Sequence, residues 1–376
     1  MKSRQIIQRM SIFLILTGLV ILISSTMNAS KAQQTYENFV EQDQKAYADF
    51  EREEAEKFAK YVVDVEKKWN EFKNSTRKDW YEYSHDLNTL SRVDFVEGVI
   101  TIETIVEKDV DDVMALAKVN IAQQIEGLFH PDSLTCDVIL EGQVEFSSPP
   151  IIDSTNAAVF IDEKVLPNAK IEEETIKSED GQERVKVTVS IKMVPNHLQL
   201  RAKKYLPTVR KYCQEYNLDV PLVLAIMQTE SHFNPRAKSP VPAFGLMQLV
   251  PRSGAREAYR FAHNEDKIVR PNYLYDPDNN IHLGCAYLAK MRDNEFKNVN
   301  NEDKIRYCIV ASYNTGPGNL SKAIVGARVI KPAVKKINEM DSNQLFEKLK
   351  TNLPYQETRD YIVKVEECRI NYLEWQ

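Results

Sequence analysis

One glutamate stands on an otherwise apolar helix face in the segment AIMQTESHFNP, residues 225–235. Glu230 follows three apolar residues at distances of seven, four and three positions, namely Val223, Ile226 and Met227. These spacings place side chains on one face of an α-helix. A carboxyl on such a face loses hydration, which disfavours its charged form and raises its pKa towards the range in which a general acid works. The pattern leaves a second interpretation open, in which Glu230 reaches water at the helix end or pairs with a nearby Lys or Arg.

Residues downstream of this acid are of types that can bind sugars. The segment 239–251 is rich in turn-forming prolines and contains Gly245, which permits close backbone approach. It also contains Gln248, whose neutral amide can bind hydroxyl or acetamido groups without adding charge. Tyr313 and Asn314 end a helical pattern directly before the breakers GPG. Their side chains are therefore expected to face a cleft rather than a core.

The elements that must position these residues are helical throughout the carboxy-terminal half. Apolar residues at steps of three and four predict a helix that ends near Asn217. The next helix is predicted to begin with Asp219 as its cap and Pro221 in its first turn, and to carry Glu230 up to the stop FNP. We therefore expect residues 196–376 to form an all-α domain.

The preceding region, residues 33–195, is predicted to be an α+β domain built on an antiparallel sheet. It begins with a long polar helix that has one aromatic face. Strand patterns cover 93–96, 99–107, 171–176 and 184–193, with turns at Glu97-Gly98 and Asp180-Gly181, and a helical pattern covers 110–128. The strict alternation over 184–193 indicates one buried and one solvated sheet face.

Residues 1–32 form a separate amino-terminal segment. Basic residues precede the apolar run 12–23, and small residues follow it as far as Ala32. This order is typical of a secretory signal, and the run is shorter than the roughly 20 residues that a spanning helix needs. Cleavage near Ala32 and retention as a single anchor both stay open. Either outcome predicts an exported protein, periplasmic or otherwise in the cell envelope, and no cysteine follows the run to carry a lipid anchor.

Composition excludes several classes of function. The 376 residues are 43% hydrophobic and 28% charged, which is typical of a globular chain long enough for two domains. The net charge is −6 and no basic stretch stands out, so nucleic acid is not an expected partner. Single histidines and the absence of any CxxC pair argue against a metal site. We expect the five cysteines to be buried free thiols; they are Cys136, Cys213, Cys285, Cys308 and Cys368.

Five motifs in order resemble the soluble-lytic-transglycosylase catalytic domain. They are ESHFNP, GLMQ, YDPDNNIHLG, SYNTGPG and ETRDYIVKV. This resemblance implies a lysozyme-like α fold and cleavage of the glycan strands of peptidoglycan. The segment SRVDFVEGVITIETIVE, residues 91–107, is similar to the accessory domain of the membrane-bound lytic murein transglycosylase C family. The resemblance therefore extends, more weakly, over the first half of the chain.

The resemblance also implies roles for individual residues. Glu230 would be the single catalytic acid and base. Substrate would be bound by Ser231, Met247 and Gln248 in the sugar subsites, by Tyr313 and Asn314 at the cleavage point, and by Tyr361 in the cleft wall. Purely structural interpretations stay open for Ser231 as a helix cap, Met247 as core and Tyr361 as an interior aromatic. Pro242 and Ser253-Gly254 depart from the residues that are common in the family.

The chemistry implied by the resemblance needs one carboxyl, whereas most glycoside hydrolases use two. Glu230 would protonate the glycosidic oxygen, and the acetamido group of the substrate would stabilise C1. The muramic acid 6-hydroxyl would then close on C1 to leave a 1,6-anhydro end, without a metal or cofactor.

Two other functions stay open from the sequence. One is a lysozyme-type hydrolase of the same fold, and the other is a cell-wall-binding protein that has the fold without the chemistry. The accessory domain could place the enzyme at the wall, modulate the cleft or bind a cell-wall or envelope protein, and the sequence does not choose among these roles.

Overall fold

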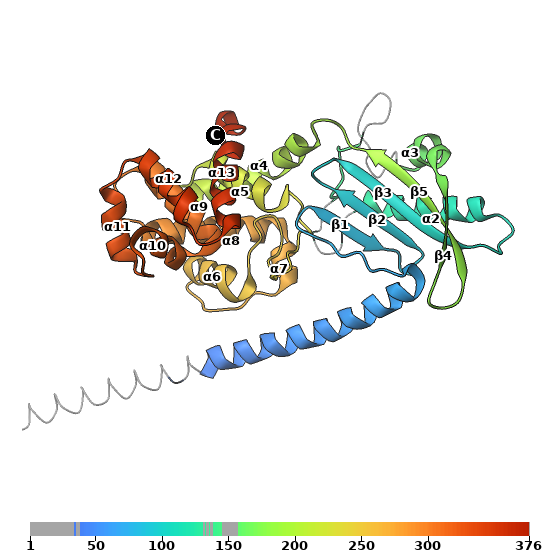
Figure 1. Cartoon of the computed structure of the whole chain (residues 1–376), viewed down its shortest axis with the longest axis horizontal. Coiled ribbons are helices and arrows are strands. Elements are labelled where there is room, and N and C mark those ends of the chain that lie inside the picture. Colours follow the sequence, from blue (N-terminus) through green and yellow to red (C-terminus); the bar gives the residue numbers. More distant parts are fainter. Residues whose placement is uncertain are drawn as a thin grey trace, which may run out of the picture.

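The computed structural model describes residues 34, 38–130, 132, 135, 138–144 and 157–375. A long helix, a sheet unit and a helical unit follow one another along the chain, and the long helix runs beside both units (Figure 1). We use "sheet unit" for residues 75–192 and "helical unit" for residues 197–375. The predicted signal or anchor, residues 1–32, and Cys136 lie outside the described residues.

The long helix spans residues 38–69. Its carboxyl end is fixed to the sheet unit, because the Trp69 indole donates a hydrogen bond to the Leu87 carbonyl at 2.8 Å. Val65 and Trp69 pack with Tyr83 and Leu90 in a small apolar cluster. Nearer its amino end, Arg252 of the helical unit pairs with Glu51 and lies over the Tyr47 ring. The predicted aromatic face therefore packs against both units.

The sheet unit contains five antiparallel strands in the order β1-β2-β3-β5-β4. They are β1 (Asp79–Tyr83), β2 (Thr89–Asp94), β3 (Val99–Glu107), β4 (Lys170–Lys177) and β5 (Glu183–Lys192). Helix α2 (Val113–Leu128) covers one face, with α3 (Ala157–Phe160), a π-helical turn (Ile161–Val165) and a 3₁₀ turn (Leu166–Asn168) beside it. The alternation in β5 buries Val187, Val189 and Ile191, as predicted for a strand with one core face.

Two boundaries in the sheet unit differ from the predicted ones. The strand predicted over 93–96 exists but lies earlier, because β2 begins at Thr89 and ends at Asp94, where the chain turns. Asp94 Oδ1 accepts from the backbone N–H groups of Val96 and Glu97, which closes this turn. The helical pattern from Val110 begins late, because Asp112 caps α2 by accepting from the Ala115 N–H group.

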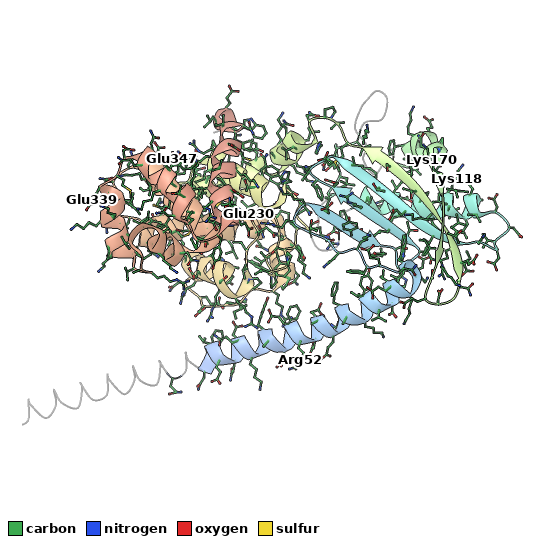
Figure 2. The ribbon with its side chains drawn as sticks, in the orientation of Figure 1. Arg52, Lys118, Lys170, Glu230, Glu339 and Glu347 are labelled. Carbon is green, nitrogen blue, oxygen red and sulfur yellow. The ribbon has the colours of Figure 1, made fainter. Side chains whose placement is uncertain are left out.

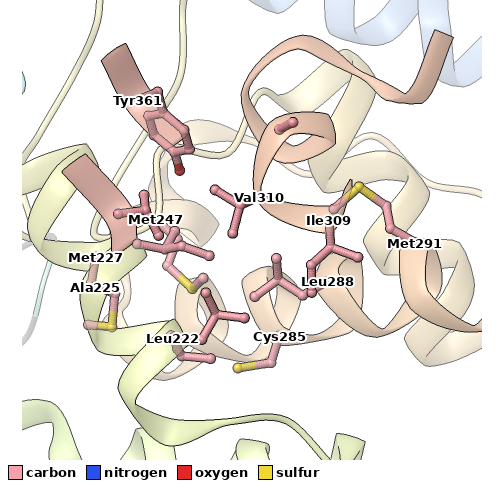
Figure 3. Packing of buried hydrophobic residues seen from close by; sticks show 14 of the residues in the cluster. Leu222, Ala225, Met227, Met247, Cys285, Leu288, Met291, Ile309, Val310 and Tyr361 are labelled. Atoms are coloured by element: carbon pink, nitrogen blue, oxygen red, sulfur yellow. The ribbon is translucent and has the colours of Figure 1, made fainter. Parts of the chain in front are cut away.

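The helical unit packs around a single apolar core. Its helices are α4 (His197–Tyr216), α5 (Val220–Ser231), α6 (Arg256–His263), α7 (Pro271–Tyr275), α8 (Pro277–Lys290), α9 (Glu302–Thr315), α10 (Pro317–Val325), α11 (Ile330–Asn338), α12 (Ser342–Asn352) and α13 (Gln356–Ile370), with π-helical turns at Pro251–Ala255 and Met291–Glu295 and a 3₁₀ turn at Leu373–Trp375. Helix α5 lies between α4 and α13. Its apolar residues meet those of α8 and α9 in the core, where Met227, Met247, Cys285 and Val310 are neighbours in the cluster (Figure 3). The predicted combination of an α+β region and an all-α region is confirmed.

The cysteines of the helical unit are unpaired. Cys213, Cys285 and Cys308 are buried and Cys368 is half-buried, and all four are free thiols. The predicted burial holds for Cys213, Cys285 and Cys308 and not for Cys368. Within the described part of the chain, no helix is both long and apolar enough to span a bilayer.

A buried arginine joins the two units. Arg201, on α4, is only 2% exposed. Its guanidinium donates to the Phe95 carbonyl at 2.7 Å, to Gln143 Oε1 at 2.6 Å and to the His232 carbonyl at 3.1 Å. Phe95 and Gln143 belong to the sheet unit, whereas His232 directly follows α5, so this one side chain ties the sheet unit to the end of α5.

Candidate active site

Helix α5 carries Glu230 to the edge of the helical unit that faces the sheet unit (Figure 2). The helix ends at Ser231 because the next two residues, His232 and Phe233, adopt left-handed backbone angles with φ of 51° and 59°. Such angles are uncommon for residues other than glycine. The Phe233 side chain is fully buried, and its packing holds this sharp turn. The predicted stop at FNP is confirmed.

The start of α5 differs in one detail from the prediction. Asp219 is the N-cap residue and Pro221 lies in the first turn, as predicted, but the Asp219 side chain makes no capping hydrogen bond. Asp219 instead accepts a hydrogen bond from Arg369 Nε of α13 at 2.6 Å. The preceding helix does end at Asn217, in a left-handed conformation, as predicted.

Glu230 is 5% exposed. Burial raises the pKa of its carboxyl from the ordinary 4.5 to about 7, while the Tyr361 hydroxyl and the Arg77 charge act in the opposite direction. The Tyr361 hydroxyl faces the carboxyl without closing a hydrogen bond of ordinary geometry. The sequence left open whether this acid is buried or instead reaches water or pairs with a Lys or Arg. It is buried with its pKa raised, and Arg77 Nη1 also lies 3.7 Å from its Oε2.

A cavity of about 370 Å³ opens in front of this carboxyl. Four of the residues singled out from the sequence line it: Glu230, Gln248, Tyr313 and Asn314. The remaining lining residues are Arg77, Ser239, Val241, Ala243, Val250, Thr315, Asn319, Tyr355, Glu357 and Thr358. The lining therefore comes from the end of α5, the loop that follows it, the end of α9, the start of α10 and the start of α13, with one residue from ahead of β1.

Gln248 lines this cavity and has a buried side-chain acceptor without a partner in the described part of the chain. Its Nε2 donates to the carbonyls of Ala237 and Gly245 at 3.1 and 3.0 Å. Its Oε1 is buried and has no hydrogen-bond partner among the described residues. A buried acceptor without a partner costs free energy, and a sugar hydroxyl or amide N–H group would satisfy it.

Tyr313 and Asn314 are held by neighbouring elements. The Tyr313 hydroxyl donates to the Met247 carbonyl at 2.6 Å, which fixes the phenol beside the GLMQ loop. Asn314 Oδ1 accepts from the Thr358 hydroxyl at 2.6 Å, which joins the end of α9 to α13. Both side chains are thus oriented before any ligand binds.

Ser231, Met247 and Tyr361 lie behind the cavity lining. The Ser231 hydroxyl is fully buried and bonds to the carbonyls of Met227 and Leu246, at 3.1 and 2.8 Å. Met247 is fully buried, with its sulfur against Gly284 of α8. Tyr361 is 4% exposed and faces Glu230 from α13. None of these three residues lines the cavity itself. Ser231 and Met247 pack behind the loop that carries Gln248, and Tyr361 faces Glu230.

Asn280 is a residue whose role sequence reasoning missed. This buried residue of α8 accepts from the Met247 N–H group at 2.8 Å and donates to the carbonyls of Phe244 and Leu274 at 2.9 and 2.7 Å. Gly245 approaches it so closely, with φ of 75°, that a Cβ atom would lie 2.4 Å from its Nδ2. Its place in the motif YDPDNNIHLG was the available signal.

Arg77 is the second residue that the sequence did not reveal. Its Nη1 lies 3.7 Å from Glu230 Oε2, and its Nη2 lies 3.3 Å from Glu357 Oε1. It belongs to the segment ahead of β1, far from the five motifs in sequence, so only the tertiary structure brings it to the cleft.

The acidic residues that line the cavity, within the described residues, are Glu230 and Glu357. Glu357 is mostly exposed, at 66% of its side chain, and pairs with Arg77. No group of three or more potential metal ligands occurs among the residues that the structure describes. The arrangement thus provides one buried proton donor beside neutral amide and phenol groups, which suits acid catalysis on an uncharged polar polymer.

Two protein families match the chain. Residues 207–331 match the Transglycosylase SLT domain, and residues 40–204 match the N-terminal domain of membrane-bound lytic murein transglycosylase C. The first match runs from within α4 to the start of α11, and the second covers the sheet unit and nearly all of the long helix.

Individual proteins are similar over most of the chain. Membrane-bound lytic murein transglycosylase C of Klebsiella pneumoniae is 33% identical over 297 residues, which is 77% of this chain and 80% of that protein. The protein of the same name from Serratia proteamaculans is 36% identical over 302 residues, which is 77% of this chain and 81% of that protein. The crystal structure of the 70 kDa soluble lytic transglycosylase of Escherichia coli aligns at 26% identity with a TM-score of 0.35, over 46% of this chain and 24% of that longer one.

Proposed function

The chain belongs to the membrane-bound lytic murein transglycosylase C family, and from that premise we propose how its cleft cleaves a glycan strand. The protein is a lytic transglycosylase that acts on peptidoglycan. The bond that we propose it breaks is the β-1,4 bond between N-acetylmuramic acid and N-acetylglucosamine, and the product is a 1,6-anhydromuramic acid end. The single observation that carries this proposal is the buried Glu230 carboxyl, whose raised pKa lets it hold a proton near neutral pH.

The first step is proton transfer from Glu230 to the glycosidic oxygen. The C1–O bond breaks, and its electron pair leaves with that oxygen, which becomes the 4-hydroxyl of the departing sugar. The positive charge that develops at C1 is met by the carbonyl oxygen of the substrate's own 2-acetamido group. Glu357 is exposed and already paired with Arg77, so the second carboxylate common in glycoside hydrolases is assigned no nucleophilic role.

The second step closes the muramic acid ring. Glu230 is now a carboxylate and removes the proton from the 6-hydroxyl, whose oxygen forms a bond to C1 and displaces the acetamido oxygen. The proton returns to Glu230, so the acid is regenerated and no water is consumed. Exclusion of water from the buried carboxyl favours this internal closure over hydrolysis.

The substrate-binding residues divide into two groups under this proposal. Gln248, Tyr313 and Asn314 line the cavity and contact the sugars, with the unpartnered Oε1 of Gln248 accepting from a sugar N–H or hydroxyl group. Ser231 and Met247 fix the loop that carries Gln248, and Tyr361 orients the Glu230 carboxyl from behind.

The proposed location is the cell envelope. The relatives are named as membrane-bound proteins, and residues 1–32 have the charge and apolar order of an export segment. We also propose that residues 33–195 and 196–376 are two domains, the first serving the second at the wall or binding an envelope protein. Glycan strands of peptidoglycan are the ligand of the helical unit.

One digest tests the proposed reaction. Purified sacculi are incubated with the wild-type protein and with Glu230→Gln, and the released fragments are analysed by mass spectrometry. Wild type is expected to release fragments with anhydromuramic ends, and the variant to release none. Fragments heavier by one water would indicate a lysozyme-type hydrolase, and binding to sacculi without release by wild type would indicate a cell-wall-binding protein.

A further inference from the structure

The cation in the active-site cavity comes from the sheet unit. Among the described residues that line the cavity, Arg77 is the one positively charged side chain. It is 38% exposed and lies between two carboxyls, 3.7 Å from Glu230 and 3.3 Å from Glu357. The guanidinium is therefore shared between the catalytic acid and an acid at the start of α13.

The segment that carries Arg77 is held rigidly within the sheet unit. The Thr76 N–H group donates to the Asp79 carbonyl at 2.9 Å. The Thr76 hydroxyl oxygen accepts from the N–H groups of Lys78 and Asp79, at 3.1 and 3.0 Å. These bonds form a tight turn around Arg77 directly ahead of β1, which fixes the direction in which its side chain leaves the backbone.

The same segment docks on the chain that directly follows the catalytic acid. Asn234 Nδ2 donates to the Arg77 carbonyl at 3.4 Å, and the Lys238 N–H group donates to the Thr76 carbonyl at 3.5 Å. Arg236, between these two residues, lies over the Trp80 ring and pairs with Asp132. The turn that ends α5 and the turn that presents Arg77 are thus held against each other.

We propose that Arg77 is a positioning residue through which the sheet unit acts directly on the catalytic carboxyl. The inference rests on the proposed function of Glu230. During bond cleavage Glu230 changes from neutral to negative in a buried site, and a nearby positive charge stabilises the negative form. Docking of the sheet unit therefore makes Glu230 a stronger acid, and it stabilises the carboxylate that must then take the proton of the 6-hydroxyl.

The pKa of Glu230 also depends on the other groups that face it. Glu357, on α13, opposes Arg77 because its negative charge favours the protonated acid. The hydroxyl of Tyr361 on α13 favours the carboxylate, and Tyr313 on α9 is a buried neutral phenol whose own pKa is raised. Arg77 is the group among these that belongs to the sheet unit, so removal of its charge isolates the contribution of that unit.

The pH profile of glycan cleavage tests the proposal. Without the Arg77 charge the pKa of Glu230 rises, so Arg77→Gln should shift the alkaline limb of kcat to higher pH by about one unit, the low end of the effect of a charge at this distance. The weaker acid should also lower the plateau of kcat severalfold. Arg77→Lys keeps the charge and should restore both features in part. Arg252→Gln, which breaks a different ion pair across the molecule, should leave the limb in place.

A second variant gives a change of opposite sign. Glu357→Gln removes the opposing negative charge, so the alkaline limb should move to lower pH. An unchanged limb in Arg77→Gln, or shifts of the same sign in Arg77→Gln and Glu357→Gln, would overturn the proposal and leave Arg77 as a structural ion pair.

A measurement independent of turnover separates this proposal from the proposed function. Carbon-13 NMR of carboxyl-labelled protein follows the titration of Glu230, whose signal is assigned by its loss in Glu230→Gln. A higher pKa in Arg77→Gln supports the proposal even if wild type releases no anhydro product, an outcome that would refute only the proposed function. An equal pKa in the two proteins overturns the proposal whatever the activity.

Discussion

At the scale of single residues, the burial of Glu230 has a cost that depends on pH. Its pKa in the folded protein, about 7, lies above the ordinary value of 4.5. Between these two values the folded state binds more protons than the unfolded state, so stability falls as pH rises through this range. Above about pH 7 the full cost of the buried charge is present.

This pH dependence predicts how stable Glu230→Gln is relative to wild type. The variant should match wild type near pH 4.5 and exceed it at pH 8 by up to about 3 kcal/mol, which is the free-energy equivalent of the difference between 4.5 and about 7. Urea unfolding at both pH values measures the difference. Glu347→Gln is the matched control, since its side chain is 65% exposed and does not line the cavity, so its loss should not produce this gain. A variant less stable than wild type at pH 8 would contradict the burial argument.

The sequence predicted some members of this site and not others. Glu230, Gln248, Tyr313 and Asn314 were accessible because each belongs to a local pattern, such as an apolar stripe, a turn or a helix end. Arg77 was not accessible, because its role depends on how two units dock. Local patterns carry no information about such docking, so the charge beside the acid became visible only in three dimensions.

At the scale of elements, Asn280 holds the loop that carries Gln248. Asn280→Ala would leave three buried backbone groups without partners, at about 1 to 3 kcal/mol each before relaxation. We expect the unfolding free energy to fall by about 3 kcal/mol or more and kcat to fall with it, as measured by urea unfolding and by product release. Asn279→Ala, at the half-buried neighbouring position, should have little effect on either quantity. Equal effects of the two substitutions would refute the role of Asn280.

Helices and strands were predicted well where the pattern of apolar residues repeats over several helical turns or several residue pairs of a strand. The alternation in β5 and the helical stripe of α4 are cases in which burial repeats many times. Their ends were harder to predict, because one side chain decides each end. Asp219 could have capped α5, yet its carboxylate accepts from Arg369 of α13. A strong charge-assisted bond to a distant element thus replaces the local cap that the sequence favoured.

At the scale of the whole molecule, Arg201 couples the two units to the turn after Glu230. Arg201→Met removes a buried cation together with its bonds to Phe95, Gln143 and His232. We expect urea unfolding to change from one transition to two, and kcat to fall because the His232 carbonyl loses its partner. Arg210→Met, on the same helix but exposed, is the matched control. A single transition with unchanged kcat would show that the coupling lies elsewhere.

The long helix gives the molecule a fixed reach. Residues 38–69 rise by 1.5 Å each, so the two ends of the helix are about 47 Å apart. The helix is fastened to the sheet unit near Trp69 and to the helical unit near Glu51. Its amino end lies beside the helical unit, where Asp43 Oδ2 accepts from the Ile268 N–H group at 3.0 Å (Figure 1). If the chain were tethered to a surface at that end, the catalytic helices would stand closest to the surface and the sheet unit would point away. The length of the helix would then set the distance between that surface and the cleft, and so which strands of the wall the cleft can reach.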